Sequence, residues 1–225
     1  MRAEEPQTVT PLADTFVQAS SPYSSEYGGL DYLKVQEYQG ELAFAFLMFD
    51  LSGVAHSPNV SIEARLRLRS VPYVSSPFRI GVRWCVNNTW NEDTLTSADA
   101  GHFYRTAPES IVIVSSGNTW YEWFVTDFVR TAIQENYEKI TLVLESEETS
   151  DGNFLAMFYS KDQTDPSLNG YRPQLVFTYY DIGGVSSDMV GKAILGVLAT
   201  AGIVFVAYRF LKKPAKKKRR SSSVR

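Results

Sequence analysis

Apolar and polar residues alternate along most of residues 12–180, as they do in β-strands with one buried face. The alternation is clearest over residues 61–69, where Ile62, Ala64, Leu66 and Leu68 fall on one face. Turns rich in Ser, Pro, Gly and Asn separate the strands, so the pattern predicts an all-β domain built as a two-sheet sandwich. The other predicted strands lie at 13–18, 31–37, 42–50, 78–87, 110–115, 120–126, 140–146, 154–160 and 174–180.

One segment of this domain has the periodicity of a helix. Over residues 127–136, Val129, Ala132 and Ile133 share a face, and a Thr-Asp pair at the start can cap the first turn. A single short helix is therefore predicted among the strands.

A continuous apolar segment follows the domain. Residues 193–208 carry no charge, and the stretch 189–211 gives about 35 Å of helix at roughly 1.5 Å per residue. The hydrocarbon core of a bilayer is about 30 Å thick. A buried helix of a soluble protein is the alternative, but no amphipathic stripe is visible. The segment is predicted to be a single C-terminal transmembrane helix.

A basic tail, residues 212–225, comes directly after this segment. The positive-inside rule keeps such a tail in the cytoplasm and predicts a cell-membrane protein with its domain outside. The opposite, tail-anchored orientation would move seven cations across the membrane. Residues 1–10 lack the apolar core of a secretory signal, so export is expected to need a leader absent from this sequence. The cations, which can also contact lipid headgroups, are Lys212, Lys213, Lys216, Lys217, Lys218, Arg219 and Arg220.

The predicted organisation thus has five parts. They are an N-terminal arm at 1–11, a β-domain at 12–180, a linker at 181–188, the transmembrane helix at 189–211 and the cytoplasmic tail at 212–225.

Charge is divided unevenly between these parts. Residues 1–191 contain 12 Lys and Arg against all 25 Asp and Glu, a net charge of -13, whereas the rest carries +10. An acidic domain repels phosphate backbones, so nucleic acid is excluded as a partner. Cys85 is the only cysteine, which excludes an intrachain disulfide and predicts a small buried side chain in a strand.

Eight short motifs occur in an order that resembles the DNRLRE-domain family. They are ADTFV at 13–17, EYG at 26–28, FLMFDLS at 46–52, ARLRL at 64–68, WNEDTLT at 90–96, VTDFV at 125–129, FYSK at 158–161 and RPQLVFTY at 172–179. The resemblance implies a jelly-roll-like sandwich on a surface protein. Some members of that family are carbohydrate-binding modules, including ones that bind alginate, and others are spacers or filament parts. Glu26 and Ser97 depart from the family pattern, and the acidic domain disfavours an anionic polysaccharide.

Aromatic residues provide the candidate contact surface. If Trp123 and Val125 point into the core, strand alternation turns Trp120 and Phe124 outward. An exposed aromatic pair can stack on a sugar ring or pack against another subunit. Trp84 and Trp90 are instead predicted to be core residues.

Other candidate sites rest on shorter patterns. Asn59 and Asn87 begin glycosylation sequons. A structural calcium ion is considered, with Asp14 and Asp50 as oxygen ligands, although no spaced calcium loop is present; otherwise no cofactor is expected.

Catalysis is not expected. Glycoside hydrolysis needs two carboxylates at a set separation across a cleft, whereas the adjacent acids at 92–93 and 147–148 are interpreted as solvated loop residues. Neither His56 nor His102 has a partner at catalytic or ligand spacing.

The sequence therefore predicts a non-catalytic, membrane-anchored surface protein that displays a sandwich domain for binding or packing. One alternative is a carbohydrate-binding module for surface or environmental polysaccharide. The other is a surface-layer or filament subunit that assembles as a homo-oligomer or with other surface proteins, through strand donation by the arm at 1–11.

Overall fold

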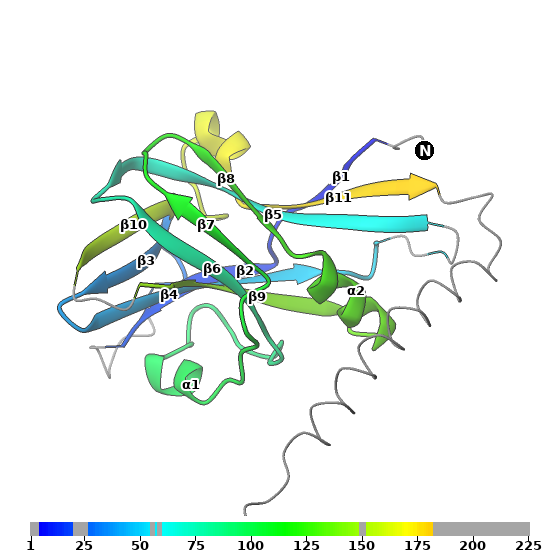
Figure 1. Cartoon of the computed structure of the whole chain (residues 1–225), viewed down its shortest axis with the longest axis horizontal. Helices are drawn as coiled ribbons and strands as arrows, with labels where there is room; N and C mark the ends of the chain where they lie inside the picture. Colours follow the sequence, from blue (N-terminus) through cyan, green and yellow to red (C-terminus); the bar gives the residue numbers. More distant parts are fainter. Residues whose placement is uncertain (1–4, 20–26, 55–56, 58–59, 149–151, 182–225) are drawn as a thin grey trace, which may run out of the picture. The chain divides into compact units, whose positions relative to one another are not determined.

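The computed structural model describes residues 5–19, 27–54, 57, 60–148 and 152–181, which fold mainly as antiparallel β-strands (Figure 1). The all-β prediction is confirmed. The strands are β1 (Gln7–Val9), β2 (Ala13–Gln18), β3 (Tyr32–Tyr38), β4 (Glu41–Asp50), β5 (Val60–Val74), β6 (Phe78–Cys85), β7 (Ser110–Val114), β8 (Trp120–Phe124), β9 (Lys139–Ser146), β10 (Asn153–Tyr159) and β11 (Gln174–Asp181).

The long strand β5 joins the two layers of the fold. Along one part it pairs with β11 on one side and β8 on the other, while its last residues, from Ser70 to Val74, pair with β10. The strand order β1-β11-β5-β10-β3-β4-β9-β6-β7 is consequently continuous, with β2 added beside β4 and β8 beside β5. The result is one curled sheet whose two halves face each other like the layers of a sandwich.

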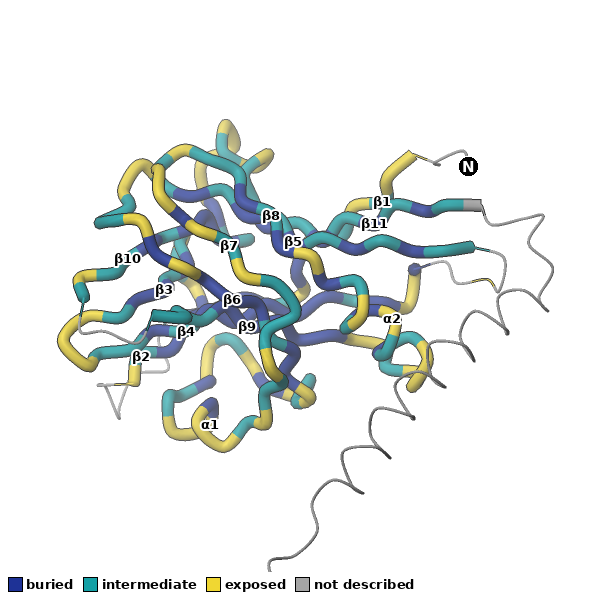
Figure 2. The backbone as a smooth tube through the Cα atoms, viewed as in Figure 1, coloured by how far each residue is buried: buried dark blue, intermediate teal, exposed yellow. Residues whose placement is uncertain are grey.

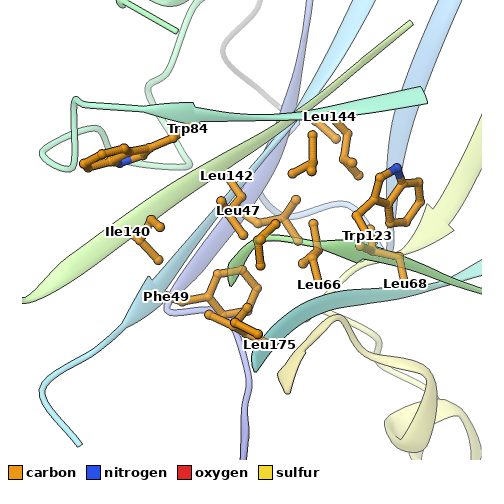
Figure 3. Packing of buried hydrophobic residues seen from close by; sticks show 14 of the residues in the cluster. Leu47, Phe49, Leu66, Leu68, Trp84, Trp123, Ile140, Leu142, Leu144 and Leu175 are labelled. Atoms are coloured by element: carbon orange, nitrogen blue, oxygen red, sulfur yellow. The ribbon is translucent and has the colours of Figure 1, made fainter. Parts of the chain in front are cut away.

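The main core lies between these halves. Leu66 and Leu68 of β5 and Trp123 of β8 pack in the same buried cluster as Leu142 and Leu144 of β9, as Figure 3 shows. The Trp123 indole N–H donates a hydrogen bond to the carbonyl of Ile80, 2.8 Å away, so the ring's one polar atom is satisfied inside the core. The inward residues predicted for residues 61–69 are all buried.

Three short helices, rather than the single one predicted, occur among the described residues. Helix α2 (Thr126–Gln134) corresponds to the predicted segment at 127–136. Helix α1 (Ser97–Gly101) and the 3-10 helix η1 (Pro166–Tyr171) were not predicted, because both are too short for an apolar period to appear. Each nevertheless has a local signal at its start: Thr96 and Asp99 form a capping box, and Asp165 caps η1 just before Pro166.

The N-terminal arm predicted at 1–11 contains strand β1. Gln7, Thr8 and Val9 pair with Phe177, Val176 and Leu175 of the same chain. The segment considered as a donor strand for a neighbouring molecule therefore pairs within its own chain at the edge of the sheet.

A second apolar cluster covers the outer surface of β2, β4, β6 and β9. The connection between β6 and β7, residues 86–109, crosses these strands and includes α1, which lies in the lower part of Figure 1 (Figures 1 and 2). The members of this second cluster are Val17, Phe46, Met48, Cys85, Trp90, Leu95, Ala100 and Val143. Cys85 is thus a buried strand residue, as predicted.

No helix within the described residues is long and apolar enough to span a membrane. The predicted transmembrane helix at 189–211, the linker beyond residue 181, the basic tail with its seven cations and the sequon residue Asn59 all lie outside the described residues.

Candidate functional site

The outer face of β5 and β8 brings the predicted aromatic pair together with a row of arginines. Phe124 stands opposite Arg65 and Trp120 opposite Arg69 in the antiparallel register. Because Tyr121 and Trp123 point into the core, the alternate residues of β8 point outward. Phe124 is 50% exposed and Trp120 is partly exposed, so the structure places both rings where the alternation put them.

Each aromatic ring on this face has a guanidinium group over it. Arg65 lies 5.0 Å from the ring centre of Phe124, and Arg67 lies 4.8 Å from that of Trp120. A third pair joins Arg69 to Tyr171, at 4.1 Å. Contacts of this kind are attractive because the ring face is electronegative. No local pattern predicts a role for Tyr171, since this residue comes from η1 and reaches the face only through the tertiary fold.

Acidic side chains link the arginines along the same face. Glu122 of β8 contacts Arg65 at 3.2 Å and Arg67 at 2.7 Å, and Glu63 contacts Arg65 at 2.6 Å. The hydrogen bond that Arg65 donates to Glu63 raises the pKa of the Arg65 guanidinium above its ordinary value. Gln174 of β11 accepts a further hydrogen bond from Arg67 at 3.2 Å. These contacts restrict long side chains that would otherwise sample many rotamers.

The face therefore combines half-exposed rings with charged groups held at defined positions. Ring faces pack against the apolar C–H surface of a sugar, and guanidinium, carboxylate and amide groups exchange hydrogen bonds with its hydroxyls. We call the surface formed by Glu63, Arg65, Arg67, Arg69, Trp120, Glu122, Phe124, Tyr171 and Gln174 the aromatic–arginine face.

A separate cluster of carboxylates surrounds Asp14. Carboxylate oxygens of Asp14, Glu92 and Asp162 lie within 4.8 Å of one another. The ammonium group of Lys161 is already among them, 2.9 Å from Glu92 and 2.7 Å from Asp162. The positive charge that a bound cation would supply is thus supplied by this side chain. Asp50 is not in the cluster; its carboxylate accepts a hydrogen bond from the backbone N–H of Ser52. The calcium ion held by Asp14 with Asp50 stays a prediction.

Burial sets the ionisation of Asp14. Its side chain is 1% exposed, and the resulting loss of solvation raises its pKa to about 7, from an ordinary value of 3.8. Hydrogen bonds from the Lys161 backbone N–H and the Ser160 hydroxyl, both 2.8 Å long, act in the opposite direction but do not compensate. Through these two hydrogen bonds the Asp14 carboxylate also links β2 to the residues that follow β10.

Of the adjacent acids at 92–93 and 147–148, Asp93 is exposed as expected, whereas the other three differ from the solvated loop residues predicted. Glu92 bonds Lys161, as described, and also accepts the backbone N–H of Asp14 at 3.0 Å. Glu147 is ion-paired with Arg83, and Glu148 accepts the backbone N–H of Arg79 at 2.8 Å. The reason for the difference is tertiary: each partner is distant in sequence and reaches the acid only through folding.

The remaining predicted residues have structural contacts. Trp84 and Trp90 are buried, as expected of core residues. The side chain of Asn87 accepts hydrogen bonds from the backbone N–H and the hydroxyl of Thr89, which closes a local turn over its sequon. His102 ends α1.

Two comparisons with known proteins bear on this arrangement. The model of carbohydrate-binding module family 96 matches residues 5–179, which include β1 and all but the end of β11. No curated protein matches the chain.

Proposed function

The chain belongs to carbohydrate-binding module family 96, and on that premise we propose that it binds a polysaccharide through the aromatic–arginine face. The observation that supports this surface is the row of three ring–guanidinium pairs on an exposed sheet face. Trp84, Trp90 and Trp123 are buried and have no such access to a ligand.

The proposed activity is binding without catalysis. Glu63 and Glu122, the two acids of the face, are both ion-paired with arginines. Glycoside cleavage needs one carboxyl group that donates a proton and a second that acts as base or nucleophile, whereas both acids of this face are held by arginines. These acids are suited to accept hydrogen bonds from sugar hydroxyls.

The binding test replaces Trp120 and Phe124 together by Ala in the full chain. Native gels containing laminarin, galactomannan, xyloglucan or alginate would measure retardation by each polysaccharide. We expect at least one neutral polysaccharide to retard the unmodified protein and not the double variant, because the stacking surface is lost. Tyr104→Ala is the matched control, since Tyr104 is 73% exposed and lies outside the face.

Two results would reject the assignment of this face. Equal retardation of the double variant and the unmodified protein would mean that the sugar binds elsewhere. A cooperative unfolding transition lost in the double variant would mean that the two rings are needed for folding. Circular dichroism during heating distinguishes the second result from a loss of binding.

The proposal includes anchoring of this domain at the cell surface by residues 189–211. Its support is the uncharged segment at 193–208 followed directly by the basic tail. Protease added to intact cells should remove the β-domain and leave the tail protected. Cleavage of the tail with the β-domain protected would reverse the orientation, and release of the whole chain by a carbonate wash would refute the anchor.

A further inference from the structure

A pocket lies on the outer surface where β3, β10 and the end of β5 run side by side. It has a volume of about 280 Å³. It is separate from the aromatic–arginine face, with which it shares no residue. The residues that line it are Gln36, Tyr38, Tyr73, Ser75, Asn153, Phe154 and Leu155.

Strand register places the lining residues together. Tyr38 pairs with Asn153, and Gln36 pairs with Leu155, so these four side chains share one face of the β3–β10 ladder. The hairpin after β3 turns through Gln39 and Gly40, both with positive φ, and so ends the strand directly after Tyr38.

Strand β5 closes the other side of the pocket. The Ser75 hydroxyl donates to the carbonyl of Asn153 at 2.7 Å and accepts the N–H of Leu155 at 2.8 Å, which fixes this end of β5 against β10. The Phe154 ring stacks on Phe78 with ring centres 5.6 Å apart. The pocket wall is therefore held by the same contacts that hold the sheet.

Gln36 is the feature that points to a ligand. The residue is 9% exposed and lines the pocket, and its side-chain amide makes no hydrogen bond to any other residue that the structure describes. The amide reaches solvent through the pocket, where its N–H and C=O groups exchange hydrogen bonds with water or with a ligand. Its donor and acceptor are available to hydroxyl groups of a molecule in the pocket.

The other lining groups define the chemistry of that molecule. The rings of Tyr38 and Tyr73 are 39% and 54% exposed, so each offers a face for stacking. The two amide side chains, Gln36 and Asn153, can pair with hydroxyls, and none of the seven lining residues is charged. Drug-sized ligands occupy pockets of roughly 300–1,000 Å³, so a pocket of about 280 Å³ suits one ring rather than a chain segment.

We propose that this pocket is a second sugar site, which binds one neutral pyranose ring between Tyr38 and Tyr73 with its hydroxyls on Gln36. The inference rests on the proposed carbohydrate function but not on the aromatic–arginine face. Tyr73 follows Arg69 along β5 by four residues, which is at most about 13 Å at roughly 3.3 Å per residue because the pairing with β10 is irregular over residues 70–74. One polysaccharide can therefore engage both sites and gain avidity.

The test measures saturation-transfer NMR signals of small sugars added to the full chain in detergent. The probes are the methyl glycosides of D-glucose, D-mannose and D-galactose, with sodium D-glucuronate as the charged comparison. We expect at least one neutral glycoside to give a signal that is lost in Tyr38→Ala/Tyr73→Ala, and weakened in Gln36→Leu, which keeps the size but removes the amide. D-glucuronate should give no signal that depends on the tyrosines.

The variants separate the two sites. The glycoside signal should persist in Trp120→Ala/Phe124→Ala, which removes only the aromatic–arginine face. A glycoside signal that survives the two tyrosine changes in a protein that also carries Trp120→Ala/Phe124→Ala, or an equally tyrosine-dependent signal from D-glucuronate, overturns the proposal. So does the absence of any glycoside signal from a protein that polysaccharide gels still retard through Trp120 and Phe124. Loss of gel retardation in the tyrosine variant alone would reject the aromatic–arginine face and leave the pocket as the binding site.

Discussion

The outer face of β5 and β8 is open to solvent, whereas the outer face of β4 and β9 is covered by residues 86–109 (Figure 2). Both faces carry aromatic rings and arginine–glutamate pairs. On the open face the rings lie under guanidinium groups and stay accessible. On the covered face Trp90 packs edge-on against Phe46, with ring centres 6.0 Å apart, and is 8% exposed. The same residue types are therefore accessible to a ligand on one face and packed in a core on the other.

The hydrophobic patterns of the strands account for the difference between the open and the covered face. β5 alternates apolar and charged residues, which suits a strand with one buried face. β4 and β9 are apolar at consecutive positions, as expected of strands buried on both faces. A continuous apolar run in an antiparallel strand thus indicates that a second segment covers the face of the strand that points away from the main core.

The largest expected effect contrasts two tryptophans. Trp90→Ala removes a buried ring whose N–H bonds the Thr141 hydroxyl at 3.0 Å, and should lower the free energy of unfolding by about 3–5 kcal/mol. Trp120→Ala removes a partly exposed ring and its contact with Arg67, and should cost about 1 kcal/mol. Urea unfolding of both variants measures the difference; equal losses would show that the two faces are not energetically distinct.

The next effect is the pH dependence of stability due to Asp14, whose backbone N–H bonds Glu92 of the covering segment 86–109. The pKa of Asp14 is about 7 in the folded protein and 3.8 as an ordinary value, so the folded state binds more protons between them. The stability due to Asp14 is present below pH 4 and lost as pH rises through 7, by up to about 4 kcal/mol. The free energy of unfolding of Asp14→Asn, minus that of the unmodified protein, should therefore rise across this range.

Asp50→Asn is the matched control for that titration. Its pKa is lowered by the hydrogen bond from the Ser52 backbone, so its stabilising contribution is lost as pH falls, the opposite direction. A flat difference curve for Asp14→Asn between pH 4 and 8 would contradict the buried, proton-binding state of Asp14.

A smaller effect distinguishes the charged pairs of the two faces. Glu145 is 12% exposed and contacts both Arg83 and Arg105. Glu145→Gln should cost about 2 to 3 kcal/mol because Arg105 loses this carboxylate, whereas Arg83 keeps its ion pair with Glu147. Glu122 is 38% exposed, and Glu122→Gln should cost about 1 kcal/mol or less. Urea unfolding at low and high salt measures the stability loss of both variants. If salt strongly reduced the loss in Glu145→Gln and not the loss in Glu122→Gln, the Glu145 pairs would be the more solvent-screened ones, contrary to this prediction.

The smallest expected effect is that of calcium. Because the Lys161 ammonium already contacts Glu92 and Asp162, neither added calcium chloride nor EDTA should shift the thermal unfolding midpoint. Lys161→Met leaves the carboxylates without this charge and serves as the comparison. A calcium-dependent rise in the unmodified protein would mean that the ion displaces Lys161.

Features set by interactions between residues near in sequence could be predicted, whereas those set by long-range contacts could not. The alternation along β5 and β8 was sufficient to place Trp120 and Phe124 on an outer face, because strand geometry is local. The sequence could not identify Tyr171, which reaches Arg69 from a turn about a hundred residues later. Asp14 was singled out, but with Asp50 as its partner, since both acids belong to strands and nothing local indicates Glu92.

Strand β1 and helix α1 were missed for a different reason. Three residues are too few to show alternation, so Gln7–Val9 was indistinguishable from a polar arm. The five residues of α1 show no apolar period, although the capping box formed by Thr96 and Asp99 was present in the sequence. The pocket at Gln36 depends on the pairing of β3 with β10, which no local pattern indicates.

The pairing of β11 with β5 also determines how the domain responds to a mechanical pull. The two strands pair over eight residues, from Gln174 opposite Arg67 to Asp181 opposite Val60. If a polymer is bound to the arginines of β5 while a force pulls on the chain that follows residue 181, the force acts parallel to the paired strands β5 and β11. The hydrogen bonds between these strands are then strained together in shear instead of being peeled apart one at a time. Under such a pull, a domain whose single cysteine cannot form an internal disulfide would resist tension through the β5–β11 ladder.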